Sequence, residues 1–138
     1  MGTSLGIDII EIDRIRRALE CHPRMAARLF TERERAYCDR RGDPAAHYAA
    51  RFAAKEATAK ALGRWLRWQE VEIAKDPSGR PRLLVHGEAA ALAAVSEGNQ
   101  LIVSLSHSRD YAVASVLLVG PQDIVCPDEN LPPGSIWT

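Results

Sequence analysis

The segment Arg51–Gly63, RFAAKEATAKALG, carries the strongest structural signal in this chain. It is rich in alanine and has neither proline nor an internal glycine, so helix propensity is high to both ends. At helical spacing Phe52, Glu56 and Lys60 share one face, and alanines at every fourth position share another. A line of alanines lets a neighbouring backbone approach closely, which predicts a half-buried helix with charged groups in the packed part. Glu56 before Lys60 is also the favoured i,i+4 ion pair of a solvated helix, worth about 0.2–0.5 kcal/mol, and spacing alone favours that interpretation.

Length and composition predict one domain with no net charge. The chain has 138 residues, with 18 lysines and arginines against 18 aspartates and glutamates, so global charge argues neither for nucleic acid nor for a membrane. Three cysteines without a CxxC pair favour reduced thiols over a disulfide framework or a zinc site. The N-terminus has neither a signal peptide nor a long apolar run, and we expect a cytoplasmic protein. A domain of this size often borrows part of its active site from a partner subunit, which makes an oligomer an open alternative.

A strand is predicted near the N-terminus, where apolar residues alternate over residues 5–10. Asp8 breaks the pattern, because aspartate is poor in strands and here shares a face with Ile10. Asp8 could cap the helix that follows, but Asp13 is better placed for that role. Asp8 therefore needs a partner, which a metal ion or a buried cation would supply.

A cationic segment follows this strand. Helices are predicted over about residues 13–21 and, after Pro23, over residues 24–30. Five arginines and one acid stand between residues 14 and 28. Such a run is usually a solvated face, and a docking site for an acidic partner is the alternative.

Turn and periodicity signals predict the remaining elements. Before the central helix, a capping box at Thr31–Glu34 starts a helix that runs to about Arg41, and a turn follows at Gly42–Pro44. After it, a hairpin is predicted with strands at 71–73 and 82–85 around the turn Asp76–Gly79. A short helix over 88–95 and strands over 101–106 and 111–119 complete the predicted elements. The last two strands are joined by the polar turn Ser106–Asp110 and are predicted to form a hairpin at the centre of the sheet. From Gly120 the composition shifts to proline and acids, which predicts a core domain over 1–119 and a tail over 120–138.

Polar residues interrupt apolar elements in three places: Asp8, Glu56 with Lys60, and Ser106–Ser108. Two lone carboxylates from distant elements suit Mg²⁺, which proteins usually hold through one or two carboxylates plus phosphate oxygens and water. Lys60 would then meet the phosphates as a point charge, although the sequence contains no P-loop motif. His107 could contact a phosphate, move a proton or only hydrogen-bond within its turn, and the serines on either side of it are expected to bind rather than attack.

Three motifs in this chain resemble those of holo-acyl-carrier-protein synthase, the small homotrimeric branch of the 4′-phosphopantetheinyl transferases. They are Gly6–Asp8, Arg51–Ala57 with Lys60, and Val103–Ser108, and they stand in order and at matching spacing from about Leu5 to Val119. The resemblance implies an α+β fold, mainly an antiparallel sheet with a long central helix, in a homotrimer with an active site at each subunit interface. It further implies that the phosphopantetheine arm of coenzyme A is moved onto a serine of apo acyl carrier protein, which releases adenosine 3′,5′-bisphosphate and serves fatty acid biosynthesis.

The resemblance also implies a role for each matching residue. By motif position, the catalytic residues are Glu56, Lys60 and His107, and the residues that hold Mg²⁺ against the pyrophosphate are Asp8 and Glu56. The resemblance implies that coenzyme A is contacted by Arg51, Lys55, Lys60, Gly63, Ser106 and His107, the last two across the interface. It implies that the acidic carrier helix is met by Arg14, Arg24 and Arg28. No motif names the acceptor of the serine proton, for which a metal-bound water and Glu34 are the candidates.

One segment departs from the family pattern. The family usually has a longer, glycine-bearing loop after the central helix, whereas Gly63–Trp68 is short and bulky, and Arg64 or Arg67 would replace the lost backbone contacts. Alternatives to the expected reaction are the same transfer to a polyketide or other specialised carrier, and a non-catalytic module that binds coenzyme A or the carrier. The presence of all three of Asp8, Glu56 and Lys60 disfavours the second. A nucleic-acid binder is disfavoured by the zero net charge and by the lack of stacking aromatic residues in the arginine segment.

Overall fold

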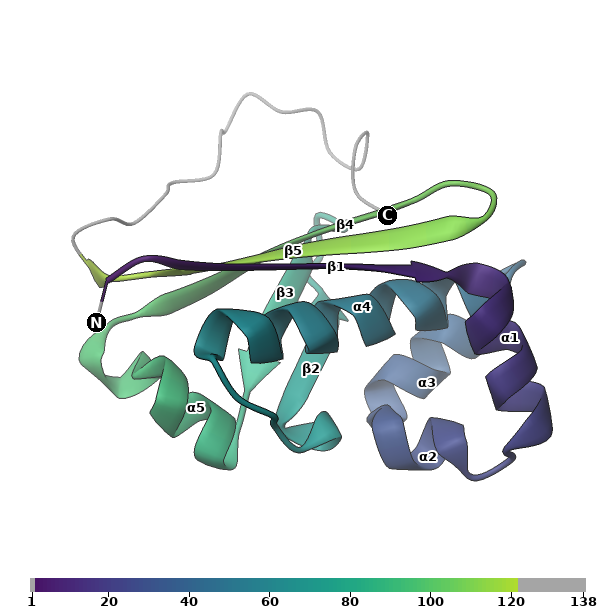
Figure 1. Cartoon of the computed structure of the whole chain (residues 1–138), viewed down its shortest axis with the longest axis horizontal. Coiled ribbons are helices and arrows are strands. Elements are labelled where there is room, and N and C mark those ends of the chain that lie inside the picture. The colour runs from purple at the N-terminus through teal and green to yellow at the C-terminus, as the bar shows by residue number, and fades with distance from the viewer. Residues whose placement is uncertain (1, 122–138) are drawn as a thin grey trace.

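The computed structural model describes residues 2–121, and the helix α4 (Pro44–Leu62) runs through its middle (Figure 1). Pro44 stands in the first turn of α4, where the missing N–H of proline is not needed. The helix ends at Gly63, whose φ of 80° is the left-handed conformation that glycine adopts without strain. The predicted central helix is therefore confirmed.

Within residues 2–121, five strands form two antiparallel sheets, which confirms the α+β fold class. The larger sheet has the order β1 (Ser4–Glu11), β5 (Tyr111–Val119), β4 (Gln100–His107), and the smaller one pairs β2 (Val71–Lys75) with β3 (Pro81–Val85). The two predicted hairpins are present. The expectation that both β4 and β5 lie at the centre of the sheet is wrong, because β1 pairs with β5 along its length and leaves β4 at the edge of the described sheet.

Shorter helices lie near the two ends of α4. They are α1 (Ile12–Cys21), α2 (Met25–Leu29), α3 (Glu32–Asp39) and α5 (Gly87–Ala93), with 3-10 turns η1 (Trp68–Glu70) and η2 (Val95–Glu97). Figure 1 shows α1, α2 and α3 gathered toward the N-terminal end of α4 and α5 near its C-terminal end. The capping box is present as predicted: the Thr31 hydroxyl accepts from the backbone N–H of Glu34 at 3.2 Å, and the Glu34 carboxylate accepts from the backbone N–H of Thr31 at 2.9 Å.

The larger sheet packs on α4 through small residues. Ala53 and Ala57 are fully buried, and Ala61 is nearly so. At Gly6, β1 approaches this alanine line so closely that a Cβ atom would stand 1.9 Å from the carbonyl oxygen of Ala57. Only glycine fits at such a distance, and the close backbone approach predicted from the alanines is confirmed.

The opposite face of β1 is apolar and exposed. Because side chains alternate along a strand, Gly6 and Ile10 face α4, whereas Leu5, Ile7 and Ile9 point away from it. The exposed fractions of the last three residues are 63, 59 and 62%. We call this stripe the apolar face of β1. Contiguous exposed apolar surface on a small protein marks an interaction site.

The predicted tail over residues 120–138 lies outside the described residues except for Gly120 and Pro121. Within residues 2–121, no helix is both long and apolar enough to cross a membrane. Cys21 is exposed and Cys38 is buried, and both have free thiols.

Candidate active site

The packing of Gly6 on Ala57 brings Asp8 alongside the last turns of α4. There the ammonium group of Lys60 lies 3.1 Å from the Asp8 carboxylate and donates a hydrogen bond to the backbone carbonyl of Ile7 at 2.9 Å. The Asp8 side chain is mostly covered, with 17% exposed, whereas 55% of the Lys60 side chain is exposed. Asp8 thus has a cationic partner, but the sequence predicted a metal ion or a buried cation, and Lys60 is exposed.

Glu56 stands one helical turn before Lys60, but in the described structure Lys60 pairs with Asp8 instead. Burial raises the pKa of Glu56 above its ordinary value, the negative charge of Asp8 raises it further, and Lys60 opposes both. The two carboxylates are therefore close enough to repel each other, and a divalent cation removes such repulsion. The ordinary i,i+4 ion pair, which spacing alone favoured, is not what these residues form.

The donor set at this point is small. Within residues 2–121, no group of three or more histidine, cysteine, aspartate or glutamate side chains could hold a metal ion. Asp8 and Glu56 can therefore hold a cation only with further ligands from a substrate and from water, as Mg²⁺ sites that act on phosphates do.

A hollow of about 290 Å³ opens beside these charged groups. It is lined by Glu56, Ala59, Lys60, Gly63, Arg64 and Trp65. The left-handed turn at Gly63 shapes it, because the chain leaves the axis of α4 there. Gly63, for which the family motif implies a coenzyme A contact, thus shares a wall with Glu56 and Lys60.

A second polar group lies around the ring of Tyr37. The guanidinium carbons of Arg41 and Arg51 stand 4.1 and 4.2 Å from the ring centroid, and the ammonium group of Lys75 stands 5.1 Å from it. Within residues 2–121, none of these three cations forms an ion pair. A cation–π contact stabilises a cation without neutralising it, so the group favours an anion. We call it the cationic cluster, and its members are Tyr37, Arg41, His47, Arg51, Lys75 and His107.

His107, at the end of β4, joins this cluster through His47, and the two ring centroids lie 5.6 Å apart. Burial, followed by the positive charge of Arg51, lowers the pKa of His47 to about 4, so this imidazole is neutral near pH 7. Ser106 is exposed and points to the opposite face of the sheet from His107, because side chains alternate along β4. The structure therefore brings His107 and Arg51 together and places Ser106 elsewhere.

Arg51 itself is only 1% exposed. Its guanidinium donates to the backbone carbonyl of His47 at 3.3 Å, and its Nε has no hydrogen-bond partner within residues 2–121. The motif implied that Arg51 touches a phosphate or ribose of coenzyme A. In this structure its charge lies beneath the surface, where it makes the cationic cluster more positive.

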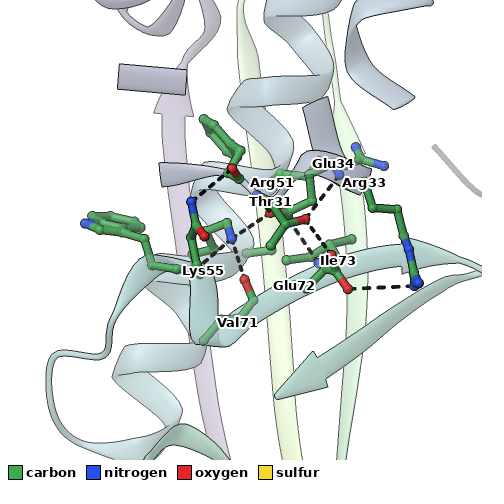
Figure 2. A network of polar contacts seen from close by, with 12 residues as sticks. Thr31, Arg33, Glu34, Arg51, Lys55, Val71, Glu72 and Ile73 are labelled. Carbon is green, nitrogen blue, oxygen red and sulfur yellow. Dashed lines mark hydrogen bonds and ion pairs between the residues drawn. The ribbon is translucent and has the colours of Figure 1, made fainter. Parts of the chain in front are cut away.

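Lys55 lies in the interior rather than at a ligand surface (Figure 2). Its ammonium group pairs with Glu34 at 2.8 Å and donates to the backbone carbonyls of Trp68, at 2.8 Å, and of Val71. Burial lowers the pKa of Lys55, and Glu34 opposes that shift. Because all three N–H groups of the ammonium are used inside the fold, the structure does not support the contact with coenzyme A that the motif implied for Lys55.

Glu34 is fully buried and both of its carboxylate oxygens are engaged (Figure 2). One oxygen meets Lys55 and the backbone N–H of Thr31, and the other accepts from the backbone N–H of Ile73 at 3.0 Å. The carboxylate thus ties α3, α4 and β2 together. Its enclosed position argues against the role of proton acceptor for a carrier serine.

The structure divides the five arginines of the cationic segment into two sets. Arg16 and Arg17 both pair with Asp13, and Arg16 also pairs with Asp43. The other three are exposed and have no ion-pair partner within residues 2–121; they are Arg14, Arg24 and Arg28. The last two line a partly apolar hollow of about 520 Å³ at α2. The three free arginines are the ones to which the family resemblance assigns carrier docking.

Sequence reasoning missed several members of these groups. His47 stands one helical turn before Arg51, and that spacing could have drawn attention to it. Tyr37, Arg41 and Lys75 carried no such signal, because they come from other elements and meet only where these pack on α4.

Residues 4–116 match the family model described as the 4′-phosphopantetheinyl transferase superfamily. The chain belongs to this superfamily. This match confirms, over most of the chain, the resemblance that was based on three short motifs.

Proteins with high sequence identity to this chain are named holo-[acyl-carrier-protein] synthase. The holo-[acyl-carrier-protein] synthase of Moorella thermoacetica is 50% identical over 116 residues, which cover 82% of this superfamily member and 91% of the relative. The synthase of Syntrophotalea carbinolica is 46% identical, with 86% and 96% covered.

Solved structures agree with these relatives. The ACPS–CoA complex of Chronobacterium ammoniagenes superimposes with a TM-score of 0.76 at 30% identity and covers 87% of this chain and 98% of that one. The holo-(acyl-carrier-protein) synthase of Bacillus anthracis in complex with CoA has a TM-score of 0.69 at 33% identity, with 83% and 94% covered.

Proposed function

We propose that this chain is a holo-acyl-carrier-protein synthase. It transfers the 4′-phosphopantetheine group from coenzyme A to a serine of apo acyl carrier protein, releases adenosine 3′,5′-bisphosphate, and serves fatty acid biosynthesis. The observation that carries the proposal is the meeting of Asp8, Glu56 and Lys60 at one point on α4, from elements about fifty residues apart. Relatives that are 46–50% identical over most of the chain bear the name of this activity.

Asp8 and Glu56 would hold Mg²⁺ in this reaction. Their fit to the ion rests on two observations: both donors are carboxylates, and the charge of Asp8 raises the pKa of Glu56. A hard cation accepts oxygen ligands and relieves this repulsion, and pyrophosphate oxygens and water complete its shell. When bound, the ion supplies charge neutralisation at the pyrophosphate.

Lys60 is placed to stabilise the leaving group. The serine hydroxyl gives its proton to water as its oxygen forms a bond to the phosphorus that bears the pantetheine arm, and the bond from that phosphorus to the bridging oxygen breaks. The electron pair leaves with adenosine 3′,5′-bisphosphate, so negative charge grows on the bridging oxygen. More than half of the Lys60 side chain is exposed beside Asp8, and its ammonium group can meet that charge.

The rest of the site comes from a neighbouring subunit in a homotrimer. The apolar face of β1 is exposed in one chain. The charges that act on Glu56 come from Asp8 and Lys60, whereas those that act on His47 come from the cationic cluster itself. Coenzyme A carries a pyrophosphate and a separate 3′-phosphate. We assign the pyrophosphate to the carboxylates of one subunit, and the 3′-phosphate to the cationic cluster of the next subunit, with His107.

The carrier docks on the three free arginines. Within residues 2–121, Arg14, Arg24 and Arg28 are exposed and have no ion-pair partner, and their positive charge steers an acidic partner toward the surface. The hollow at α2 accepts an apolar side chain between these charges. We also place the reaction in the cytoplasm, in agreement with the free thiols of Cys21 and Cys38.

Mass spectrometry of the carrier tests the proposal. Purified protein, Mg²⁺ and coenzyme A are mixed with apo carriers from fatty acid and polyketide synthesis, and each carrier is weighed. The expected result is the added mass of one phosphopantetheine on the fatty acid carrier, with none for the Glu56→Gln variant. If only the polyketide carrier were modified, the physiological target would be a polyketide carrier in place of the fatty acid carrier. An unmodified carrier in every mixture would refute the enzymatic function.

A further inference from the structure

The loop that leaves α4 holds an aromatic side chain out in solvent. Trp65 is 69% exposed, although tryptophan is the side chain that gains most from burial. Its ring contacts that of Trp68, with centroids 5.9 Å apart, and Trp68 in turn stacks on Phe52 of α4, with centroids 5.2 Å apart and planes at 22°. Trp65 is therefore the outer member of an aromatic stack rooted on the central helix.

The loop is tied down at both ends. At its start Gly63 closes α4 and Arg64 pairs with Glu88 on α5 at 3.0 Å. At its end the buried ammonium group of Lys55 holds the backbone carbonyl of Trp68 at 2.8 Å. Lys55, which does not reach a ligand itself, thus fixes the base on which the exposed indole rests. A loop that is held at both ends keeps its side chain in one position, so that little conformational entropy is lost on binding.

The stack stands beside the proposed reaction centre. Trp65 lines the same hollow of about 290 Å³ as Glu56 and Lys60. The hollow thus has a charged wall and an aromatic wall. A ligand that fills it must have an anionic part next to an uncharged, largely apolar part.

Coenzyme A has that order of parts. Its pyrophosphate separates a charged adenosine 3′-phosphate from the pantetheine arm, which has no charge and bears two methyl groups on its second carbon. The cationic cluster supplies positive charge for the 3′-phosphate, and Glu56 and Lys60 lie where the pyrophosphate is proposed to bind. The arm is the part that remains, and an indole face packs well against its methyl groups and amides.

We propose that Trp65 is the residue that binds the pantetheine arm of coenzyme A at the reacting phosphate. This inference rests on the proposed function and adds to it a specificity-determining residue in the loop where this chain departs from its family. The indole holds the arm so that the phosphorus to be transferred stays over Glu56 and Lys60. Positioning of this kind lowers the barrier without any new chemical group.

Two ligands and two variants test the inference. Isothermal titration measures the binding of coenzyme A and of adenosine 3′-phosphate 5′-diphosphate, which keeps every phosphate of coenzyme A and lacks the arm. We expect Trp65→Ala to weaken coenzyme A binding about tenfold, in keeping with the free energy of one aromatic contact. Binding of the arm-less nucleotide stays unchanged, and Trp65→Phe restores most of the affinity for coenzyme A.

The outcomes separate this inference from the proposed function. Equal weakening of both ligands, or of neither, would overturn the role of Trp65 while the wild-type protein still bound coenzyme A. A raised KM for the carrier with unchanged coenzyme A binding would assign Trp65 to the carrier instead, and a changed oligomeric state on size-exclusion chromatography would assign it to a subunit contact. Wild-type protein that bound neither nucleotide would refute the proposed function itself.

Discussion

The carbonyl oxygen of Ala57 lies 1.9 Å from the point where a Cβ atom on Gly6 would stand. This contact sets β1 directly on α4. Asp8, two residues further along β1, then faces the last turns of the helix and meets the ammonium group of Lys60 at 3.1 Å. The proposed metal site therefore depends on a position that carries no side chain at all.

Gly6→Ala should lower stability and activity together. The added methyl group has only backbone atoms to displace, and overpacking of this kind costs about 1–3 kcal/mol. Urea unfolding measures the loss, and the transfer assay should show a parallel fall because Asp8 moves away from Glu56. Gly42→Ala is the matched control, since a Cβ at Gly42 would meet nothing within 4 Å. Equal stability of the two variants would contradict the contact.

Glu56→Gln should raise stability near pH 7 while it abolishes transfer. The native pKa of Glu56 is raised from 4.5 by burial and by Asp8, so the native state holds this proton more tightly than the unfolded chain does. Stability therefore falls as the pH rises above about 4.5, and the full penalty is present once native Glu56 is ionised. The melting temperature of the variant should exceed that of the wild type at pH 7 and approach it below pH 4.5.

Mg²⁺ provides the second readout for Glu56. A cation that binds the native state and not the unfolded chain stabilises the protein, so Mg²⁺ added together with coenzyme A should raise the melting temperature of the wild type above its value with coenzyme A alone and leave that of Glu56→Gln unchanged. Glu20→Gln, at an exposed position of α1, serves as the control and should respond as the wild type does. An identical response of all three proteins would remove Glu56 from the metal site.

Lys55→Met should mainly lower stability, whereas Lys60→Met should mainly lower activity. Loss of the Lys55 ammonium leaves the buried Glu34 carboxylate uncompensated, which costs about 3–5 kcal/mol. The Lys60 pair is half-exposed, and its loss costs less than about 1 kcal/mol, yet transfer should fall at least about 100-fold because the leaving group loses its cation. Urea unfolding and the transfer assay on both variants separate the two roles. A fully stable Lys55→Met variant would contradict the assigned network.

The double variant Arg14→Glu with Arg28→Glu should raise the KM for the carrier about tenfold and reduce its dependence on salt. Binding of coenzyme A should not change, because these side chains lie on the α1–α2 surface. Arg17→Glu is the control on the same helix, since Arg17 is already paired with Asp13 at 2.9 Å. An equal rise in KM from Arg17→Glu would indicate a general charge effect in place of a docking site.

Much of the architecture was predictable from local patterns. Alanine-rich propensity between Pro44 and Gly63 predicts α4, the Thr31–Glu34 capping box predicts the start of α3, and alternation predicts the strands. The central position of β5 was not predictable from its hairpin with β4, because the pairing of β1 with β5 joins residues a hundred or more positions apart.

The sequence alone predicts candidate residues for phosphate chemistry, because helix spacing, an aspartate in an apolar strand and the Ser106–Ser108 turn are local properties. It does not show which partner each charge takes. Lys60 had Glu56 as a local partner and meets Asp8 instead, and Lys55, in the same motif, is drawn inside by Glu34. Those choices follow from which elements pack against each face of α4, since burial and distance set the strength of every ion pair.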